Sequence, residues 1–374
     1  MRQFSYAAGP SALPMEVLEK CSQAVISFTS EGESILEVSH RSKAFQAVID
    51  DASRLLRELL VIPDNYHVLF MQGGGTGQFA ASALNALAHR KPDHTVGDYL
   101  VTGNWSQSAA NEARQLGIEV NIVSDGKKEF DGAYRGVPLR ESWKLTDPSK
   151  AAYFYYCANE TVYGVEAHKV PDIDPSVPLI CDMSSNILSR TIDVSKFEII
   201  FAGAQKNLGP AGVTIVIVRD DILQRTAASS IPTVMDYAVM AKSGSMYNTP
   251  PTFSILALKF NLEWASANGG NEAMEQRSRQ NSSQIYQVID KSNGFYSCPV
   301  VPHSRSLTNI VFNLPAPELE SEFVSQAAAS GLINLKGHRS VGGIRASLYN
   351  GVPDAATLAL AEFMDAFLTK NTGQ

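Results

Sequence analysis

One lysine, Lys206, occupies a position where lysine is unusual. It lies in IIFAGAQKNLGPAGVTIVIVR (residues 199–219), between two apolar runs and among glycine and alanine residues. Lysine is seldom buried without a partner. Partial desolvation at a strand end would lower the pKa of this lysine and leave more neutral amine, which is the form that attacks a carbonyl carbon. The alternative is a lysine whose ammonium group extends from the strand end into solvent.

An acid that suits the same site is Asp182. It ends the apolar run VPLICD, 24 residues before Lys206. Two neighbouring strands of one sheet would bring both side chains to the same edge. Pyridoxal phosphate requires these two groups, a lysine that forms a Schiff base and an acid that faces the pyridine nitrogen. The alternative is an aspartate that caps a turn at Ser184 and Ser185.

A glycine-rich loop offers a place for a phosphate group. QGGGTG (72–77) follows the apolar run HVLFM and precedes the helical stretch FAASALNALAH. Backbone N–H groups at a helix N-terminus favour a phosphate. The loop lacks the lysine of a P-loop, and no acidic residue ends a second strand about 20 residues on, as a dinucleotide-binding fingerprint requires. Trp105, just after the next strand, is either an aromatic face for a pyridine ring or a plain core tryptophan.

The elements that must position these residues follow from the apolar pattern. Short runs that are apolar on both faces are typical of parallel strands covered by helices. The predicted strands are 67–71, 99–103, 119–123, 151–157, 178–182, 198–203 and 213–219. The predicted helices are 15–31, 43–60, 79–89, 106–117, 253–268, 270–290 and 354–370. Alternating stretches such as TNIVFNL and IRASLYN indicate a smaller α+β unit near the C-terminus.

The composition excludes several classes of protein. The 374 residues include 31 basic and 38 acidic ones, a net charge of −7, and nucleic-acid binders usually carry a basic excess. No apolar run approaches the roughly 18 residues that span a membrane, and the N-terminus lacks the apolar core of a signal peptide. The four cysteines are far apart, which argues against a zinc site or a disulfide framework. We therefore expect a cytoplasmic protein without metal, nucleic-acid or membrane ligands.

Several stretches together resemble one family, the phosphoserine aminotransferases, which are class V pyridoxal-phosphate enzymes of fold type I. These stretches are EVSHRSKAF (37–45), VLFMQGGGTGQFAA (68–81), CANETVYGVE (157–166), CDMSSNILSR (181–190), FAGAQKNLGPAGVTIVIVRDD (201–221), YNTPPTFSI (247–255) and KGHRSVGGIRASLYN (336–350). The resemblance implies an α/β fold with a large domain (15–258) around a mostly parallel seven-stranded sheet. It also implies a smaller α+β domain, formed by residues 1–14 and 259–374.

The resemblance implies pyridoxal 5′-phosphate as the cofactor and assigns residues to it. Lys206 would be the catalytic lysine and Asp182 the partner of the pyridine nitrogen. Trp105 would stack on the ring, and Thr161 would contact the phenolic oxygen. The cofactor phosphate would be held by Gly75, Thr76 and Gln205, together with Asn248 and Thr249 from the second subunit of a homodimer.

The implied reaction is a transamination between L-glutamate and 3-phosphohydroxypyruvate in serine biosynthesis. Both substrates are multiply anionic, and arginine suits bidentate pairing with such groups. Arg345 would bind the α-carboxylate. His40 and Arg41, with His338 and Arg339 of the other subunit, would bind the phosphate or the glutamate side chain, although each His-Arg pair taken singly also fits a solvated turn.

Three other functions remain as alternatives. One is a different fold-type-I enzyme, such as another aminotransferase or a cysteine desulfurase, although no cysteine lies in an evident glycine-flanked active loop. Another is a nicotinamide-dependent oxidoreductase that uses the glycine loop, which would leave Lys206 unexplained. The third is a catalytically inactive relative that only binds ligand.

Overall fold

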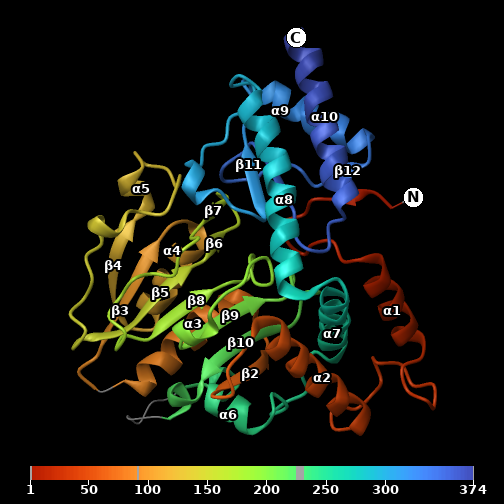
Figure 1. Cartoon of the computed structure of the whole chain (residues 1–374). Coiled ribbons are helices and arrows are strands. Elements are labelled where there is room, and N and C mark those ends of the chain that lie inside the picture. Colours follow the sequence, from red (N-terminus) through yellow and green to blue (C-terminus); the bar gives the residue numbers. More distant parts are fainter. Residues whose placement is uncertain (1, 91, 225–230, 374) are drawn as a thin grey trace.

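A central seven-stranded sheet organises the computed structural model, which describes residues 2–90, 92–224 and 231–373. Its strand order is β2-β10-β9-β8-β5-β3-β4 (Figure 1). The strands are β2 (Tyr66–Met71), β3 (Val96–Val101), β4 (Glu119–Asp125), β5 (Ala151–Cys157), β8 (Leu179–Asp182), β9 (Ile199–Gly203) and β10 (Thr214–Arg219). Only β10 among them runs antiparallel to its neighbours, β2 and β9. The predicted α/β class and the mostly parallel seven-stranded sheet are confirmed.

Helices cover both faces of this sheet. The helices of the described chain are α1 (Met15–Ile26), α2 (Lys43–Leu60), α3 (Gly74–His89), α4 (Asn104–Gln115), α5 (Gly126–Glu129), α6 (Tyr237–Lys242), α7 (Thr252–Ala267), α8 (Gly270–Lys291), α9 (Pro317–Ala329) and α10 (Asp354–Thr372). α2 and α7 pack on one face and α3 and α4 on the other. Side chains alternate between the faces along each strand, so β9 sends Ile200 toward α2 and Phe201 toward α3. Because both faces of these strands are buried, their sequences are apolar at consecutive positions rather than alternately apolar and polar.

Two local predictions differ from the structure. The first helix ends at Ile26, because Ser27 is extended and the Phe28 N–H donates to the Glu33 carbonyl, so that a turn replaces the last helical residues. α9 was absent from the predicted elements. Among its residues only Phe323 and Ala327 are buried, which leaves no regular apolar period to recognise.

A separate hydrophobic core lies above the sheet in Figure 1, where the blue C-terminal part meets the red N-terminal arm. Tyr6 of the arm packs in this core with residues of α8, α9 and α10. The arm strand β1 (Phe4–Ser5) pairs in parallel with β12 (Leu332–Ile333), and β11 (Asn309–Phe312) pairs with β13 (Ile344–Ser347). A short hairpin of β6 (Asn159–Glu160) and β7 (Val165–Glu166) leads from the sheet toward this part. The alternating stretches TNIVFNL and IRASLYN therefore do form strands, as predicted.

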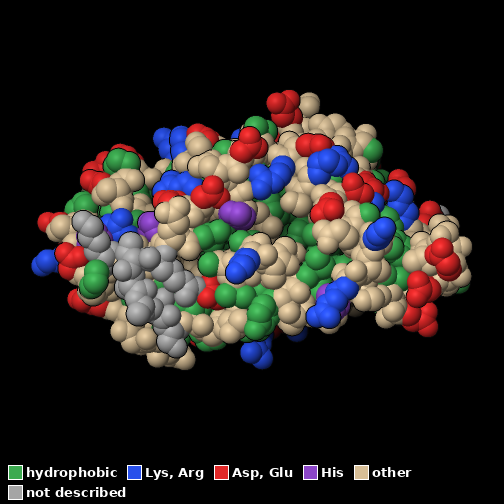
Figure 2. Space-filling model, turned by 90° about the horizontal axis from the view of Figure 1, so that it is seen from below, with side chains coloured by type: hydrophobic (Ala, Val, Ile, Leu, Met, Phe, Trp, Pro, Cys, Tyr) green, Lys and Arg blue, Asp and Glu red, His purple; other side chains and the backbone are tan. Residues whose placement is uncertain are grey.

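The surface of the molecule carries charged side chains of both signs. On the face seen in Figure 2, basic and acidic side chains are interspersed. None of the helices in the described chain has the length and apolar character needed to cross a membrane. Within residues 2–90, 92–224 and 231–373, no group of three or more His, Cys, Asp or Glu side chains could hold a metal ion.

Candidate active site

Lys206 and Asp182 meet at one edge of the sheet. β8 and β9 are parallel neighbours, with Asp182 paired to Phe201, so both strands end at the same edge. Asp182 is the last residue of β8, whereas Lys206 lies in the turn three residues after the end of β9 at Gly203. The predicted adjacency of the two strands is therefore confirmed, and the lysine belongs to the turn rather than to the strand itself.

The amine of Lys206 is held by two groups from other elements. Its Nζ donates a hydrogen bond of 2.8 Å to the Thr161 hydroxyl. The same atom lies 5.4 Å from the centre of the Trp105 ring, within cation–π range. Burial lowers the pKa of Lys206, and the negative charge of Asp182 opposes that shift. The alternative of a lysine extended into solvent does not describe this side chain.

Asp182 is a buried acid, with 5% of its surface exposed. Its Oδ1 accepts a 2.8 Å hydrogen bond from the Ser184 N–H, so the aspartate also caps the turn that follows it. The Ser184 hydroxyl in turn accepts from the Gly203 N–H at 3.0 Å, which ties the ends of β8 and β9 together. Burial raises the pKa of Asp182, while the charge of Lys206 and the bond from Ser184 oppose that change. The turn-capping interpretation is therefore confirmed, and the role of Asp182 at a pyridine nitrogen stays a prediction.

The glycine loop forms the first turn of α3. The helix begins at Gly74, after Gly73 in the left-handed region (φ 91°), so the N–H groups of its first turn have no intrahelical acceptor. A Cβ added at Gly75 would lie 3.9 Å from Asp182 Oδ2 and 3.7 Å from Ser184 Oγ, so the glycine leaves room next to the acid. This edge has a cavity of about 260 Å³, whose lining includes Gly75, Thr76, Trp105, Asp182, Gln205 and Lys206.

These groups match what pyridoxal phosphate needs. The cavity brings together an amine, a buried acid, an indole ring and the N-terminus of α3, which favours a phosphate. The Trp105 indole lines this cavity, and its Nε1 atom is buried without a hydrogen-bond partner within the described chain. The residues that line this cavity therefore fit pyridoxal phosphate.

The residues predicted to bind the substrates, and those predicted to come from a second subunit, lie outside the lining of this cavity. Arg345 on β13 lies outside the lining but contacts Thr161, since its Nη1 donates to the Thr161 carbonyl at 3.3 Å. In the described part of the chain, the cavity lining includes none of the other predicted residues. These are His40, Arg41, Asn248, Thr249, His338 and Arg339. Their predicted action across a subunit boundary stays a prediction for Asn248, Thr249, His338 and Arg339.

Some residues at the site were missed by sequence reasoning. Ser11 of the N-terminal arm donates its N–H to the Gln205 carbonyl at 2.9 Å, and its hydroxyl contacts the Lys206 carbonyl. Ser184 bridges β8 and β9, as described above. Glu160 binds the first turn of α4. Glu160 had a sequence signal, since it comes two residues after the apolar run AAYFYYCA, and an acid so close to such a run requires buried partners.

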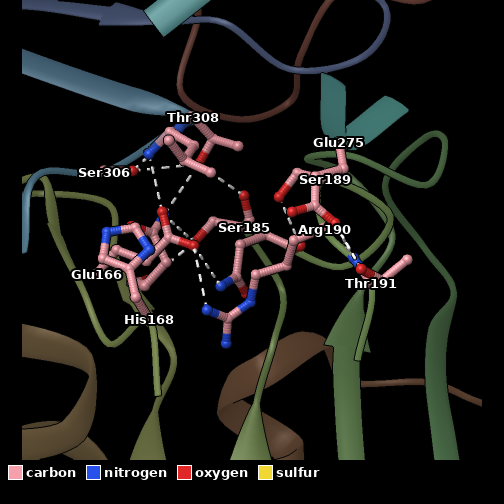
Figure 3. Close-up of polar contacts among 12 residues, drawn as sticks. Glu166, His168, Ser185, Ser189, Arg190, Thr191, Glu275, Ser306 and Thr308 are labelled. Carbon is pink, nitrogen blue, oxygen red and sulfur yellow. Dashed lines mark hydrogen bonds and ion pairs between the residues drawn. The ribbon is translucent and has the colours of Figure 1, made fainter. Parts of the chain in front are cut away.

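The loop that follows β8 is fixed by buried polar contacts (Figure 3). The carboxylate of Glu166 accepts from the Leu307 N–H at 2.8 Å, and the Arg190 Nη1 lies 4.0 Å from its Oε1. Thr308 donates its hydroxyl proton to the Ser185 carbonyl at 2.9 Å. Leu307 and Thr308 immediately precede β11, so these contacts join the second core to the loop that carries the end of the aspartate strand.

Gly103→Ala is expected to lower the free energy of unfolding by about 1–3 kcal/mol, because the added methyl group would overpack a closed site. Its Cβ would lie 2.4 Å from Glu160 Cδ, and that side chain is held by two backbone N–H groups. Urea unfolding measures the change. The exposed Ser108→Ala on the same helix is the control, with an expected effect within about 0.5 kcal/mol. Equal stability of the two variants would contradict the crowding.

Comparison with known proteins places the chain in a family. The model of the family described as aminotransferase class-V matches residues 4–355. The phosphoserine aminotransferase of Drosophila melanogaster is 48% identical over 371 residues, which are 98% of this chain and 99% of that protein. A solved phosphoserine aminotransferase from Bacillus circulans subsp. alkalophilus has a TM-score of 0.92 at 42% identity and covers 99% of both chains. The pyridoxal-phosphate-bound enzyme from Trichomonas vaginalis has a TM-score of 0.90 at 39% identity, over 97% of this chain and 100% of that chain. The resemblance of the sequence is thus confirmed, and the chain belongs to the aminotransferase class-V family.

Proposed function

We propose that this protein is a phosphoserine aminotransferase. It moves the amino group of L-glutamate to 3-phosphohydroxypyruvate, which gives 2-oxoglutarate and O-phospho-L-serine, the product used in serine biosynthesis. The observation that carries the proposal is the Lys206 amine, held by Thr161 and Trp105 at the edge it shares with Asp182. Full-length relatives that bear this enzyme's name support the choice of substrates.

We assign the cofactor to the cavity at this edge. When bound, pyridoxal 5′-phosphate supplies a ring that draws electrons from the substrate Cα. Asp182 would hold the ring nitrogen, Trp105 would stack on the ring and Thr161 would contact its phenolic oxygen. The phosphate is assigned to Gly75, Thr76 and Gln205, with Asn248 and Thr249 of the partner subunit.

The chemistry of this chain centres on the Lys206 amine. Burial lowers the pKa of the lysine, so a larger fraction of the amine is neutral near pH 7 than for an exposed lysine. In the neutral form, the Nζ amine would accept the proton of the substrate Cα and hold it. The Thr161 hydroxyl, 2.8 Å from Nζ, orients the amine for that transfer.

The substrate groups belong to the cationic residues around the cavity. Arg345 binds the α-carboxylate, and its backbone neighbours on β13 fix its place beside Thr161. His40 and Arg41, with His338 and Arg339 of the partner subunit, bind the phosphate or the second carboxylate. The proposal therefore includes a cytoplasmic homodimer with shared sites. It also divides the chain at residues 15–258 and at 1–14 with 259–374, which the separate core around Tyr6 supports.

A rate comparison tests the function. With L-glutamate as donor, kcat/KM for 3-phosphohydroxypyruvate should exceed that for hydroxypyruvate, which lacks the phosphate. The expected ratio is about 10²-fold or more, since charge-assisted hydrogen bonds to a phosphate contribute roughly 1.5–3 kcal/mol each. Equal values would point to a different aminotransferase, and binding of NAD without transamination would point to an oxidoreductase. Light scattering would measure the mass of the assembly.

Arg345→Lys is expected to raise KM for both substrates about tenfold, because an ammonium group cannot form the bidentate pair that a guanidinium forms with a carboxylate. Arg345→Ala should raise KM by about 10²-fold, since each charge-assisted bond is worth roughly 1.5–3 kcal/mol. Steady-state kinetics measure both. The exposed Arg54→Lys on α2 is the matched control and should leave KM unchanged. An unchanged KM in Arg345→Ala would remove this residue from the substrate site.

A further inference from the structure

Glu160 is a buried acid at the site for which the proposed reaction has no direct use. It is fully buried, and it immediately precedes Thr161 in the chain. Its Oε2 accepts from the Trp105 N–H at 2.9 Å, and its Oε1 accepts from the Ser106 N–H at 2.8 Å. The Ser106 hydroxyl gives a third bond to Oε1, at 2.6 Å. A carboxylate thus closes the N-terminus of α4 from a different part of the chain.

The hydrogen bonds define the charge state of this group. All three hydrogen-bond partners of the carboxylate are donors, and a protonated carboxyl would need an acceptor for its own proton. The Ser106 hydroxyl itself accepts from the Thr102 N–H at 2.9 Å and from the Gly103 N–H at 3.2 Å, so both of its lone pairs are used and it donates its proton to Glu160. Burial raises the pKa of Glu160, and the bonds from Ser106 and Trp105 oppose that change. Glu160 is therefore an anion, stabilised by the positive end of α4.

Glu160 connects the two groups that hold the lysine amine. Its side chain fixes the backbone of Trp105, whose ring lies 5.4 Å from Lys206 Nζ. Its backbone leads directly into Thr161, whose hydroxyl accepts from the same Nζ. The Glu160 carbonyl accepts from the Gly164 N–H at 2.9 Å, so the turn that carries Thr161 is also closed. The Glu160 side chain has no space to shift toward Gly103, because a Cβ added at Gly103 would already lie 2.4 Å from Glu160 Cδ.

We propose that Glu160 is a positioning residue of the reaction, which sets the indole ring of Trp105 and the hydroxyl of Thr161 at fixed places around the Lys206 amine. The expected effect on turnover rests on the proposed function. The geometry from which the positioning role is inferred does not depend on that function. Its negative charge has a second consequence, because it favours the protonated form of Lys206 and adds to the effect of Asp182.

The test compares Glu160→Gln with the wild-type protein in three measurements. Glutamine has nearly the same shape, but its amide nitrogen is a donor that faces the N–H and O–H donors of α4. We expect kcat to fall about 10- to 100-fold, the loss typical of a displaced catalytic group. The Trp105 emission, isolated as the difference from Trp105→Phe in each background, should change. The pKa of Lys206, followed by competitive acetylation and mass spectrometry, should fall, because a nearby negative charge is lost.

Glu198→Gln is the matched control. Glu198 is also a buried acid on this sheet, and it accepts from the Leu179 N–H and pairs with Arg219. It precedes β9, at the opposite edge from Asp182. We expect Glu198→Gln to lower the melting temperature while kcat, the Trp105 emission and the Lys206 pKa stay as in the wild type.

Two results would overturn the proposal. One is a folded Glu160→Gln protein with wild-type emission and an unchanged Lys206 pKa, and the other is a control that reproduces all three changes. If Glu160→Gln does not fold, Ser106→Ala removes the 2.6 Å bond to Glu160, together with the bonds that the hydroxyl accepts from the Thr102 and Gly103 N–H groups. This variant should lower kcat and change the Trp105 emission in the same direction as Glu160→Gln. Unchanged values there would also reject the role. The emission and acetylation measurements do not require turnover, so they test this inference independently of the proposed function. A failure of the proposed function itself would appear in the kinetics of the wild-type protein.

Discussion

Lys206→Ala is expected to lower kcat of transamination about 10⁴-fold, the upper end of what a positioned acid–base group contributes. The alanine variant lacks the only amine that reaches Thr161 and Trp105 among the described residues of the cavity lining. The steady-state rate with L-glutamate and 3-phosphohydroxypyruvate measures the loss. Thr161 keeps its place in the turn after β6, so the site should retain its shape.

Lys206→Arg separates charge from chemistry in the same experiment. The guanidinium group keeps the positive charge beside Asp182, but it does not lose its proton in proteins and cannot act as a neutral amine. We therefore expect this variant to be as inactive as Lys206→Ala. Full turnover in either variant would show that another group moves the proton and would reject the mechanism.

Asp182→Asn is expected to lower kcat about 10²- to 10³-fold, a loss comparable to removing one preorganised electrostatic group from an active site. Asparagine can still accept the Ser184 N–H bond through its side-chain oxygen, so the turn after β8 stays capped. Only the negative charge disappears. Because that charge raises the pKa of Lys206 against the effect of burial, the pKa should fall further in the variant.

The matched control for this change is Asp98→Asn. Asp98 is a buried acid on β3 that accepts from the Thr146 N–H at 3.0 Å, and it lies outside the cavity lining. We expect Asp98→Asn to lower stability without a comparable loss of kcat. Equal losses of kcat in both variants would mean that the effect of Asp182→Asn arises from folding rather than from the site.

Local patterns in the sequence predicted most of the elements. α2 has the predicted bounds, 43–60, because its buried residues recur with a helical period over the whole segment. The predicted strands of the sheet agree with the observed ones to within a few residues, since each is a short run that is buried on both faces. α9 escaped prediction because its apolar residues are too few to form a period.

By itself, the sequence determined the fold class and the pair of residues at the centre of the site. The apolar runs before Asp182 and Lys206 indicated strand ends, and residues at such ends gather at one edge of a parallel sheet. Only the tertiary structure decided what surrounds the amine. Thr161 and Trp105 precede Lys206 by many residues, and Ser11 comes from the N-terminal arm. Hydrogen bonds of about 3 Å depend on where the folded chain brings distant segments. Sequence periodicity describes only the neighbours within one element.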